Sequence, residues 1–223
     1  MFHVKQVPQT QITQTRGLGD VVAEAQRIGI ILPDDVWDRL AAHVALLRKW
    51  QPAINLVGPA TLPDVWRRHV LDSLQLLPQI PTTAERLVDL GSGAGFPGLV
   101  IAIARPDLSV TLIEADSRKA AFLAECARAT APRTRIITAR IESLPPEPAD
   151  VVTARALAPL AKLFDWAAKF VSDPAICLFH KGKGLDDELT AAQRHWMMDI
   201  DRVPSVTAPD ATILRVARLR PRR

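Results

Sequence analysis

A glycine-rich stretch between an apolar strand-like run and an apolar helix-like run limits the folds open to this chain. The segment LVDLGSGAGFPGLVIAIA, residues 87–104, holds four glycines within eight residues. A turn with so few side chains lets a ligand approach the backbone, and the following helix N-terminus offers free N–H groups. The stretch therefore predicts a cofactor site at the first strand–helix turn of a parallel sheet.

Strand-like and helix-like runs alternate after residue 85. The expected strands are 86–90, 109–115, 134–140, 150–155, 175–181 and 211–219. The expected helices are 97–105, 117–129, 159–171 and 185–196. This alternation is typical of a parallel sheet with helices on both faces, and it predicts a Rossmann-like α/β fold.

The region before the first strand has a helical period. Apolar residues recur there at spacings of three and four, as in Trp37, Leu40, Val44 and Leu47. The tryptophans at such spacings are expected in the core. We divide the chain into a disordered N-terminus (1–16), an N-terminal helical cap (17–82), a Rossmann-like domain (83–219) and a basic C-terminal end (220–223).

Composition excludes several classes of protein. The chain has 223 residues, of which 48% are hydrophobic and 23% charged, as in ordinary globular domains. The longest charge-free apolar run, 90–104, is short for a membrane span, and the start has no apolar segment of a signal peptide. Cys126 and Cys177 lack a CxxC spacing, so we expect buried thiols in a cytoplasmic protein, with neither disulfide nor zinc.

The positive charge is concentrated at the C-terminus. The formal net charge is +4, from 28 basic and 24 acidic residues. Five arginines lie in the final nine residues, namely Arg215, Arg218, Arg220, Arg222 and Arg223. Without them the balance is 23 against 24, or −1. A nucleic-acid partner and a merely solvated basic end both fit this distribution.

Two cofactors fit the glycine turn. Residues 93–98, GAGFPG, match the dinucleotide pattern GxGxxG. Asp89 stands two residues before Gly91, and a carboxylate there can hold the charged amino-acid end of S-adenosylmethionine. Glu114 closes the second strand, where it can accept both ribose hydroxyls of either ligand. These residues favour S-adenosylmethionine and leave NAD as the alternative.

Several longer motifs occur in the order seen in one bacterial family. They are INLVG (54–58), RHVLDSL (68–74), the run 87–123 that contains GSGAGFPG, ARIESL (139–144), VVTARAL (151–157) and HKGKG (180–184). The chain resembles the ribosomal RNA small subunit methyltransferases G (RsmG, the glucose-inhibited division protein B family). The resemblance implies a mostly parallel seven-stranded sheet and S-adenosylmethionine as cofactor. It also implies methylation of N7 of a guanine in the decoding-region loop of 16S ribosomal RNA, as naked RNA or in a small ribosomal subunit particle.

The resemblance also implies which residues form the site. It implies that the cofactor is contacted by Gly91, Gly93 and Phe96 in the first turn and by Ile141 and Glu142 beside the adenine. Arg155, after the fourth strand, is implied to lie near the methyl-transfer end.

Four basic residues are candidates for RNA contact. Arg67 and Arg68 lie on a helix, where they contact phosphate or only solvent. Lys181 and Lys183 are flanked by glycines at a strand end, and we expect them to contact phosphate or substrate.

Three polar residues share one face of the same helix as Arg67. His69, Asp72 and Ser73 are three and four residues apart. We expect a hydrogen-bonded network that docks the cap or faces RNA, and no metal site.

Guanine N7 needs no general base, which agrees with the lack of an obvious nucleophile–base pair. The N7 lone pair lies in the ring plane and carries no proton, so catalysis rests on positioning, with Arg155 as a candidate positioning residue. Amino-group methylation usually shows an (Asp/Asn)-Pro-Pro-aromatic motif where this chain has TARALAP. Methylation of pyrimidine C5 needs a cysteine at a strand end, whereas Cys126 and Cys177 fall mid-helix and mid-strand.

Other functions stay open at this point. A methyltransferase for another RNA site or a small molecule, and a non-enzymatic nucleotide-sensing RNA-binding module, both fit the sequence. A monomer is favoured.

Overall fold

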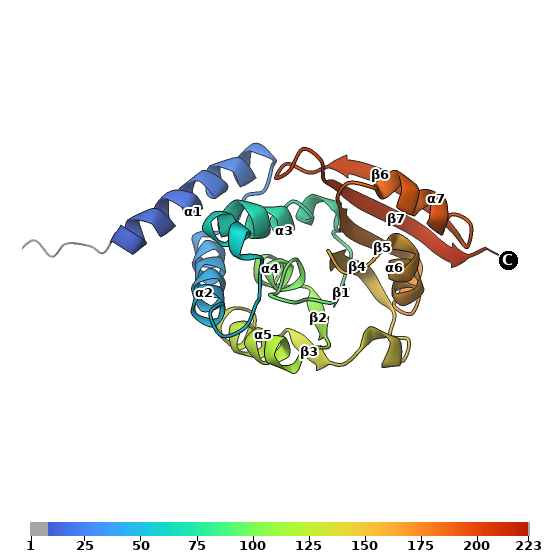
Figure 1. Cartoon of the computed structure of the whole chain (residues 1–223), viewed down its shortest axis with the longest axis horizontal. Helices are drawn as coiled ribbons and strands as arrows, with labels where there is room; N and C mark the ends of the chain where they lie inside the picture. The colour runs from blue at the N-terminus through green and yellow to red at the C-terminus, as the bar shows by residue number, and fades with distance from the viewer. Residues whose placement is uncertain (1–8, 223) are drawn as a thin grey trace, which may run out of the picture.

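The computed structural model describes residues 9–222 as one sheet between layers of helices (Figure 1). The strands are β1 (Arg86–Leu90), β2 (Ser109–Glu114), β3 (Arg135–Thr138), β4 (Ala149–Arg155), β5 (Val171–Lys181), β6 (Trp196–Pro204) and β7 (Thr212–Pro221). They lie in the order β3-β2-β1-β4-β5-β7-β6. Strands β1 to β5 are parallel, and β7 is antiparallel to both its neighbours. The predicted mostly parallel, seven-stranded sheet is confirmed.

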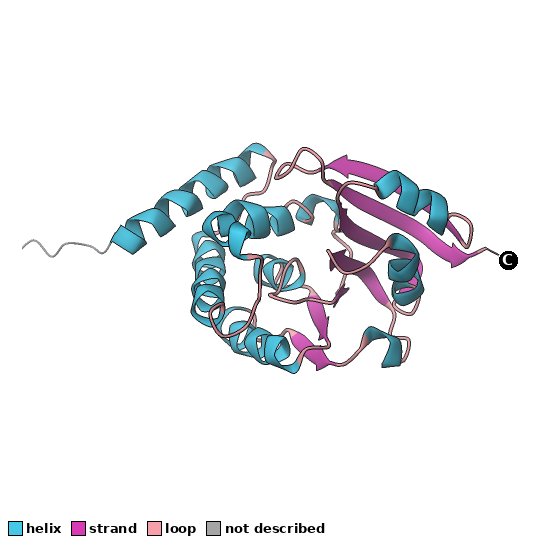
Figure 2. Ribbon diagram, in the orientation of Figure 1, coloured by secondary structure: helices cyan, strands magenta, loops and turns pink. Residues whose placement is uncertain are grey.

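Helices cover both faces of this sheet (Figure 2). The α-helices are α1 (Gln9–Arg27), α2 (Asp34–Trp50), α3 (Asp72–Leu74), α4 (Gly98–Ala104), α5 (Ser117–Thr130), α6 (Leu160–Ala167) and α7 (Leu185–Ala192). Side chains alternate along the strands, so that Val151 packs in the core with α4 and α5 while Val152 packs with α6 and α7. Strands buried on both faces have to be nearly continuous apolar runs, as the sequence pattern indicated.

The N-terminal helices share the core of the sheet. Leu40 and Leu47 of α2 belong to the same buried apolar cluster as Leu99 of α4 and Phe122 of α5. Short 3₁₀ segments, η1 (Pro59–Asp64), η3 (Leu77–Gln79) and η4 (Ile141–Ser143), complete the chain. Of the described helices, none is long and apolar enough to cross a membrane.

A π-helical turn interrupts the cap. The segment η2 (Trp66–Leu71) is π-helical and runs directly into α3. Single π turns inside helices occur frequently at functional sites, because they turn side chains away from the regular helical positions. This turn carries Arg67, Arg68 and His69, three of the residues singled out in the sequence.

The N-terminal prediction was wrong over residues 9–16. Disorder was expected for 1–16, but α1 begins at Gln9, while residues 1–8 lie outside the described part of the chain. Val21 and Ala25 are buried and anchor this helix on the cap. Since no proline lies between Gln9 and Arg27, the helix continues backward from that anchor.

Strand β6 was missed, and the neighbouring helices were made too long. Helix α7 ends at Ala192, whereas a helix was expected to residue 196, and Trp196 begins a strand. Helix α6 likewise ends at Ala167, and β5 starts at Val171. After α6 the sequence stays mostly apolar into β5, and after α7 the helical spacing of Leu189 and Ala192 continues to Trp196, so the periodicity alone did not show either boundary.

Candidate cofactor and substrate site

A cavity of about 360 Å³ lies at the carboxyl ends of the parallel strands. Its walls combine residues from the glycine turn, from the end of β2 and from the segments after β3 and β4. They are Gly91, Gly93, Ile113, Glu114, Ala115, Lys119, Ala139, Arg140, Ile141, Glu142, Arg155, Ala156, Leu157, Lys162 and Trp166. The strand order reverses between β1 and β4, and sheets of this kind bind their ligands at that point. The volume is in the range of small-molecule sites.

The glycine turn owes its shape to positive backbone angles. Gly91 and Gly93 have φ values of 65° and 56°, which other residues rarely adopt. The side chain of Leu157 lies against Gly91, where an added Cβ would clash with its Cδ1. At Gly98 an added Cβ would lie 2.5 Å from the Cβ of Asp89, so this glycine lets α4 pack closely on β1.

Glu114 joins the turn to the end of β2. Its Oε2 accepts a hydrogen bond from the Gly93 N–H, and its Oε1 accepts one from the Asp116 N–H, both at 2.8 Å. A carboxylate oxygen has two lone pairs, so each oxygen can accept one further hydrogen bond. Since Glu114 lines the cavity, it can still receive the hydroxyls of a ribose.

Asp89 lies beneath the turn and is absent from the cavity wall. It is completely buried and accepts a hydrogen bond of 2.6 Å from the Thr153 hydroxyl on β4. Burial raises the pKa of this carboxyl to about 6, although hydrogen bonds from Thr153 and Ser92 oppose the shift. Its position indicates a role in connecting β1, β4 and the turn, and the expected contact with the amino-acid end of a ligand stays a prediction.

Phe96 faces the cap. Its ring centroid lies 5.0 Å from the rings of both His43 and His69, and the Arg155 guanidinium lies 5.1 Å from its centre. Phe96 is buried and does not line the cavity. The ring is held among residues of α2, η2 and β4, and its contact with the cofactor stays a prediction.

His69 is neutral, and its hydrogen bonds fix its tautomer. Its Nδ1 lies 2.8 Å from the Arg155 Nη2 and has to accept, since a guanidinium only donates. Its Nε2 therefore carries the proton and donates to the Thr61 hydroxyl, at 2.8 Å. Burial, assisted by the charge of Arg155, lowers the pKa of His69 to about 3. The neutral imidazole thus accepts a hydrogen bond from Arg155 and adds no second positive charge beside it.

Asp72 connects Arg155 to the end of β5 and to the β6–β7 loop. Its carboxylate lies 3.2 Å from the Arg155 Nη1 and accepts hydrogen bonds from Gln75 and from the Thr207 hydroxyl. The Asp72 carbonyl also lies 2.7 Å from the His180 Nε2. The expected network that docks the cap is confirmed. Among the described residues, no group of three or more His, Cys, Asp or Glu side chains could hold a metal ion.

Arg67 and Arg68 lie in different environments. Arg67 donates to the carbonyls of Val206 and Thr207, both at 2.7 Å, and forms an ion pair with Glu24 of α1. It clamps α1 and the β6–β7 loop to the rest of the cap, and an RNA contact of this residue stays a prediction. Arg68 is exposed beside the site, and its carbonyl accepts a hydrogen bond from Arg155.

The two glycine-flanked lysines also differ. The Lys181 ammonium lies 2.6 Å from Glu188 and donates to the Ala158 carbonyl, with only 10% of its side chain exposed. Because Glu188 also accepts from the Leu160 N–H, this pair holds the segment between β4 and α6. The expected phosphate contact is not open to Lys181 in this geometry. Lys183 is 83% exposed and pairs with Asp210.

Basic and aromatic residues of the cavity wall were not predicted from the sequence. Lys162 and Trp166 are one turn apart on α6, with the Lys162 ammonium 4.7 Å from the Trp166 ring. Lys162 also lies 4.0 Å from Glu142. Lys162 and Trp166 are four residues apart on a helix that follows a strand end, and this spacing was the available signal. Trp166 was expected only in the core.

Comparison with known proteins shows the family to which this chain belongs. The sequence model of the family described as rRNA small subunit methyltransferase G matches residues 37–214. The chain belongs to this family. Curated methyltransferases G include one from Paramagnetospirillum magneticum, 54% identical over 180 residues that cover 80% of this chain and 87% of the relative. Another, from Acidiphilium cryptum, is 47% identical over 205 residues, covering 91% and 94%. The resemblance found in the sequence is confirmed, and the chain is a methyltransferase of small-subunit ribosomal RNA.

Solved structures of lower identity share the fold with this methyltransferase G. TYW2 from P. horikoshii, solved in complex with MeSAdo, has a TM-score of 0.54 and 18% identity over 76% of this chain and 65% of that one. Fibrillarin from Aeropyrum pernix, with natively bound S-adenosyl-L-methionine, has a TM-score of 0.50 and 16% identity over 60% and 66%. At these identities the likeness concerns the fold alone.

The buried Asp89 predicts an unusual dependence of stability on pH. Its folded pKa of about 6 lies above the ordinary 3.8, so the folded state keeps a proton that the unfolded state releases. This contribution to stability is present at low pH and is lost as the pH rises through 6. Replacing Asp89 with Asn removes the titration. As the pH rises from about 4.5 to 7, the free energy of unfolding of the wild type should fall by about 2 kcal/mol relative to that of the Asp89→Asn variant.

Urea unfolding of both proteins across this pH range measures the difference. Other titrating groups are common to the two proteins and cancel. A difference that stays constant with pH would show that the folded pKa of Asp89 is not raised.

Proposed function

We propose that this chain transfers the methyl group of S-adenosylmethionine to N7 of a guanine in the decoding-region loop of 16S ribosomal RNA. One observation supports this above all: in a chain of this family, the cavity brings the glycine turn, Glu114 and Arg155 together at the carboxyl ends of β1, β2 and β4. The position N7 is part of the proposal, since the names of the relatives specify only the RNA.

The residues present fit an adenosine cofactor. Gly91 and Gly93 offer backbone without side chains, Glu114 offers free lone pairs for ribose hydroxyls, and Ile141 and Glu142 form the wall where an adenine ring would lie. The same features suit NAD, and family membership favours S-adenosylmethionine. When bound, this cofactor supplies a methyl group made electrophilic by the attached sulfonium.

The protein's own contribution to the chemistry is orientation. Guanine N7 has no proton to remove, so a general base is not required. Arg155 lines the cavity with its guanidinium fixed by His69, Asp72 and the ring of Phe96. A rigid cationic group at this place can position the RNA base against the methyl donor, and accurate positioning lowers the barrier through orientation.

The remaining features of the proposal concern organisation. We infer a cap over 17–82 and a catalytic domain over 83–219 that work as one unit, since they share a core. A monomer is supported by the scarcity of large exposed apolar side chains, which among the described residues are Ile31 and Met197. A cytoplasmic location follows from the proposed substrate, 16S RNA or the small ribosomal subunit particle.

Mapping of methylated guanines tests the proposed function. RNA from cells with and without the gene is compared, and the purified protein is given labelled S-adenosylmethionine with 16S RNA or small subunits from the deficient cells. We expect one N7-methylated guanine in the decoding-region loop to be missing from cells without the gene. The purified protein should restore this methylation in RNA from those cells. Methylation at another position or of a small molecule would replace the proposed substrate, and binding without turnover would indicate a non-enzymatic sensor.

Glu114 provides a test of cofactor binding. Replacement with Ala should weaken S-adenosylmethionine binding by roughly 1–3 kcal/mol, because buried hydrogen-bonding groups of ligand and turn lose their acceptor. Calorimetry measures the dissociation constant for S-adenosylmethionine and for NAD, and a thermal melt without ligand verifies folding. An unchanged dissociation constant would mean that Glu114 does not hold the ribose, and tight NAD binding alone would overturn the cofactor assignment.

Arg155 provides a test of positioning. Arg155→Ala should lower the single-turnover rate at saturating RNA by on the order of 10²-fold, because the base loses its alignment with the methyl donor. Arg133→Ala is a matched control, since Arg133 is exposed at the other end of the sheet order. A variant that loses RNA affinity but retains the rate at saturation would make Arg155 a binding residue only.

A further inference from the structure

The direction of β7 carries the arginine-rich C-terminus away from the cavity. Thr212 pairs with Lys181 at the carboxyl end of β5, and Ala217 pairs with Ile176 near the start of that strand. From Thr212 to Arg220 the strand extends about 25–30 Å. The terminal arginines therefore lie at the edge of the sheet opposite the carboxyl ends where the cofactor cavity opens.

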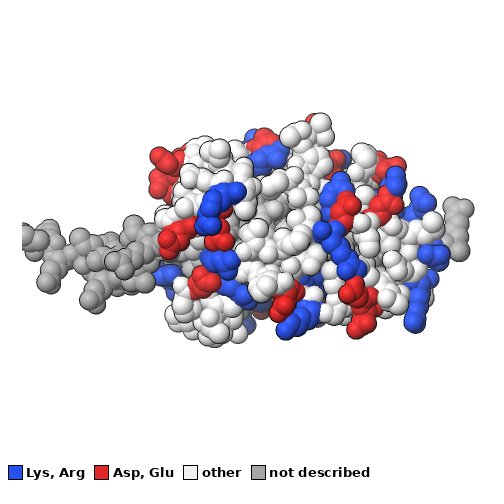
Figure 3. Space-filling view, turned by 90° about the horizontal axis from the view of Figure 1, so that it is seen from above, with Lys and Arg blue, Asp and Glu red and all other residues white. Residues whose placement is uncertain are grey.

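Four arginines gather at this edge. Arg218, Arg220 and Arg222 are exposed at the end of β7. The Arg222 N–H donates to the His195 carbonyl at 2.8 Å, which brings the exposed Arg194 beside them. We call these four residues the C-terminal basic surface. Figure 3 shows Lys and Arg side chains gathered at the end of the molecule where the chain ends.

The charge of this surface is only partly neutralised. Arg218 forms an ion pair with Asp199. Within residues 9–222, no carboxylate lies within ion-pair distance of Arg194, Arg220 or Arg222. Asp173 is a further acidic residue near this surface and lines a small cavity together with Arg218 and Arg220. A local excess of positive charge thus remains on a chain whose other residues are nearly balanced.

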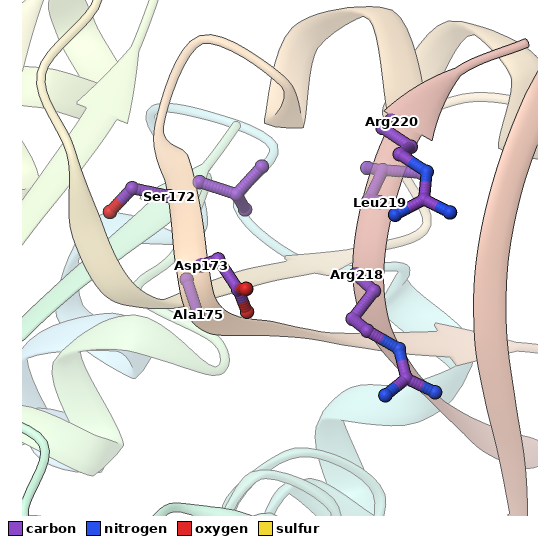
Figure 4. A pocket seen from close by; sticks show the side chains of 7 residues that line it. Ser172, Asp173, Ala175, Arg218, Leu219 and Arg220 are labelled. Atoms are coloured by element: carbon purple, nitrogen blue, oxygen red, sulfur yellow. The ribbon is translucent and has the colours of Figure 1, made fainter.

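The surface is also hollowed on both sides of β7. One cavity, of about 130 Å³, lies between the start of β5 and the end of β7 and is lined by Val171, Ser172, Asp173, Ala175, Arg218, Leu219 and Arg220 (Figure 4). A second, of about 240 Å³, lies toward β6 and is lined by Gln193, Trp196, Met197, Met198, Asp199, Arg218, Arg220 and Arg222. Arg218 and Arg220 line both cavities. Guanidinium groups beside shallow hollows suit the bidentate binding of phosphate oxygens.

We propose that the C-terminal basic surface binds a second segment of RNA backbone, remote from the guanine that is methylated. The inference rests on the proposed function, because it assumes an RNA substrate large enough to reach both edges of the sheet. A folded ribosomal RNA or a small subunit spans the 25–30 Å between them, whereas an excised loop that fills the cavity region alone does not. Contacts so far from the reacting atoms are the same in the ground and transition states, so they raise affinity without changing the rate at saturation.

Substitution is the appropriate test, because truncation would damage the sheet. Arg220 pairs with Met197 and Pro221 with Trp196 in the β6–β7 ladder, so deleting 218–223 removes strand pairing together with charge. The double variant Arg220→Gln/Arg222→Gln keeps the backbone. Arg128→Gln/Arg133→Gln removes the same charge from exposed positions near β3, the opposite edge strand.

Binding of 16S RNA and of small subunits is measured across a range of salt concentrations, together with single-turnover methylation. We expect the first double variant to bind several-fold more weakly and to reduce the slope of log affinity against log salt by roughly 1.5, since each phosphate contact contributes about 0.7–0.9. Its rate at saturation should equal that of the wild type. Equal losses in both double variants would overturn the proposal in favour of general electrostatic attraction, and unchanged binding would overturn it outright.

A tethered cleavage probe tests the location directly. Both native cysteines are buried, so Arg222→Cys creates the one accessible thiol for an iron chelate that generates hydroxyl radicals. Cleavage should cluster in an RNA segment other than the decoding-region loop, and a probe on Arg128→Cys should not cut there. The absence of such a cluster, in a protein that still methylates its guanine, would refute the second contact while leaving the proposed function intact.

Discussion

The site depends on one partly buried guanidinium between the cap and the sheet. Arg155 ends β4, and its partners His69 and Asp72 belong to the cap. An ionised group removed from water is tolerated only when its hydrogen bonds are satisfied, so the charge requires both partners in place. The catalytic end of β4 and the helical cap therefore fold as mutually dependent parts, and the cap is a structural component of the cavity.

This dependence extends to the glycine turn through aromatic stacking. Phe96 belongs to the turn, yet its ring lies between His43 of α2 and His69 of η2. His43 also contacts the Ala94 carbonyl through its Nε2, at 2.8 Å. Burial lowers the pKa of His43 to about 4, so it is neutral and adds no charge beside Arg155. Two neutral imidazoles thus hold the turn from the side away from the ligand.

Local sequence was sufficient to predict the fold and two parts of the cavity wall, the glycine turn and Glu114. These features depend on residue types at strand ends and on the periodicity of apolar residues. The glycines of the turn and Glu114 are recognisable from their place at strand ends. The direction in which each side chain points, and the partner it meets, could not be predicted from local sequence. Arg67 and Lys181 are bound by Glu24 and Glu188, whose proximity arises only from tertiary packing. Strand β6 was missed because its first apolar residues continue the period of α7.

The position of β7 has a consequence for synthesis of the chain. This strand follows β5 and β6 along the chain, yet it lies between them and pairs with both. Until β7 has left the ribosome, one edge of β5 is unpaired and β6 has no partner in the sheet. Exposed edges of this kind promote association between unfinished chains. The sheet closes only after β7 has been added, so chains that stop before Thr212 are expected to aggregate, although nearly all of their apolar core is present.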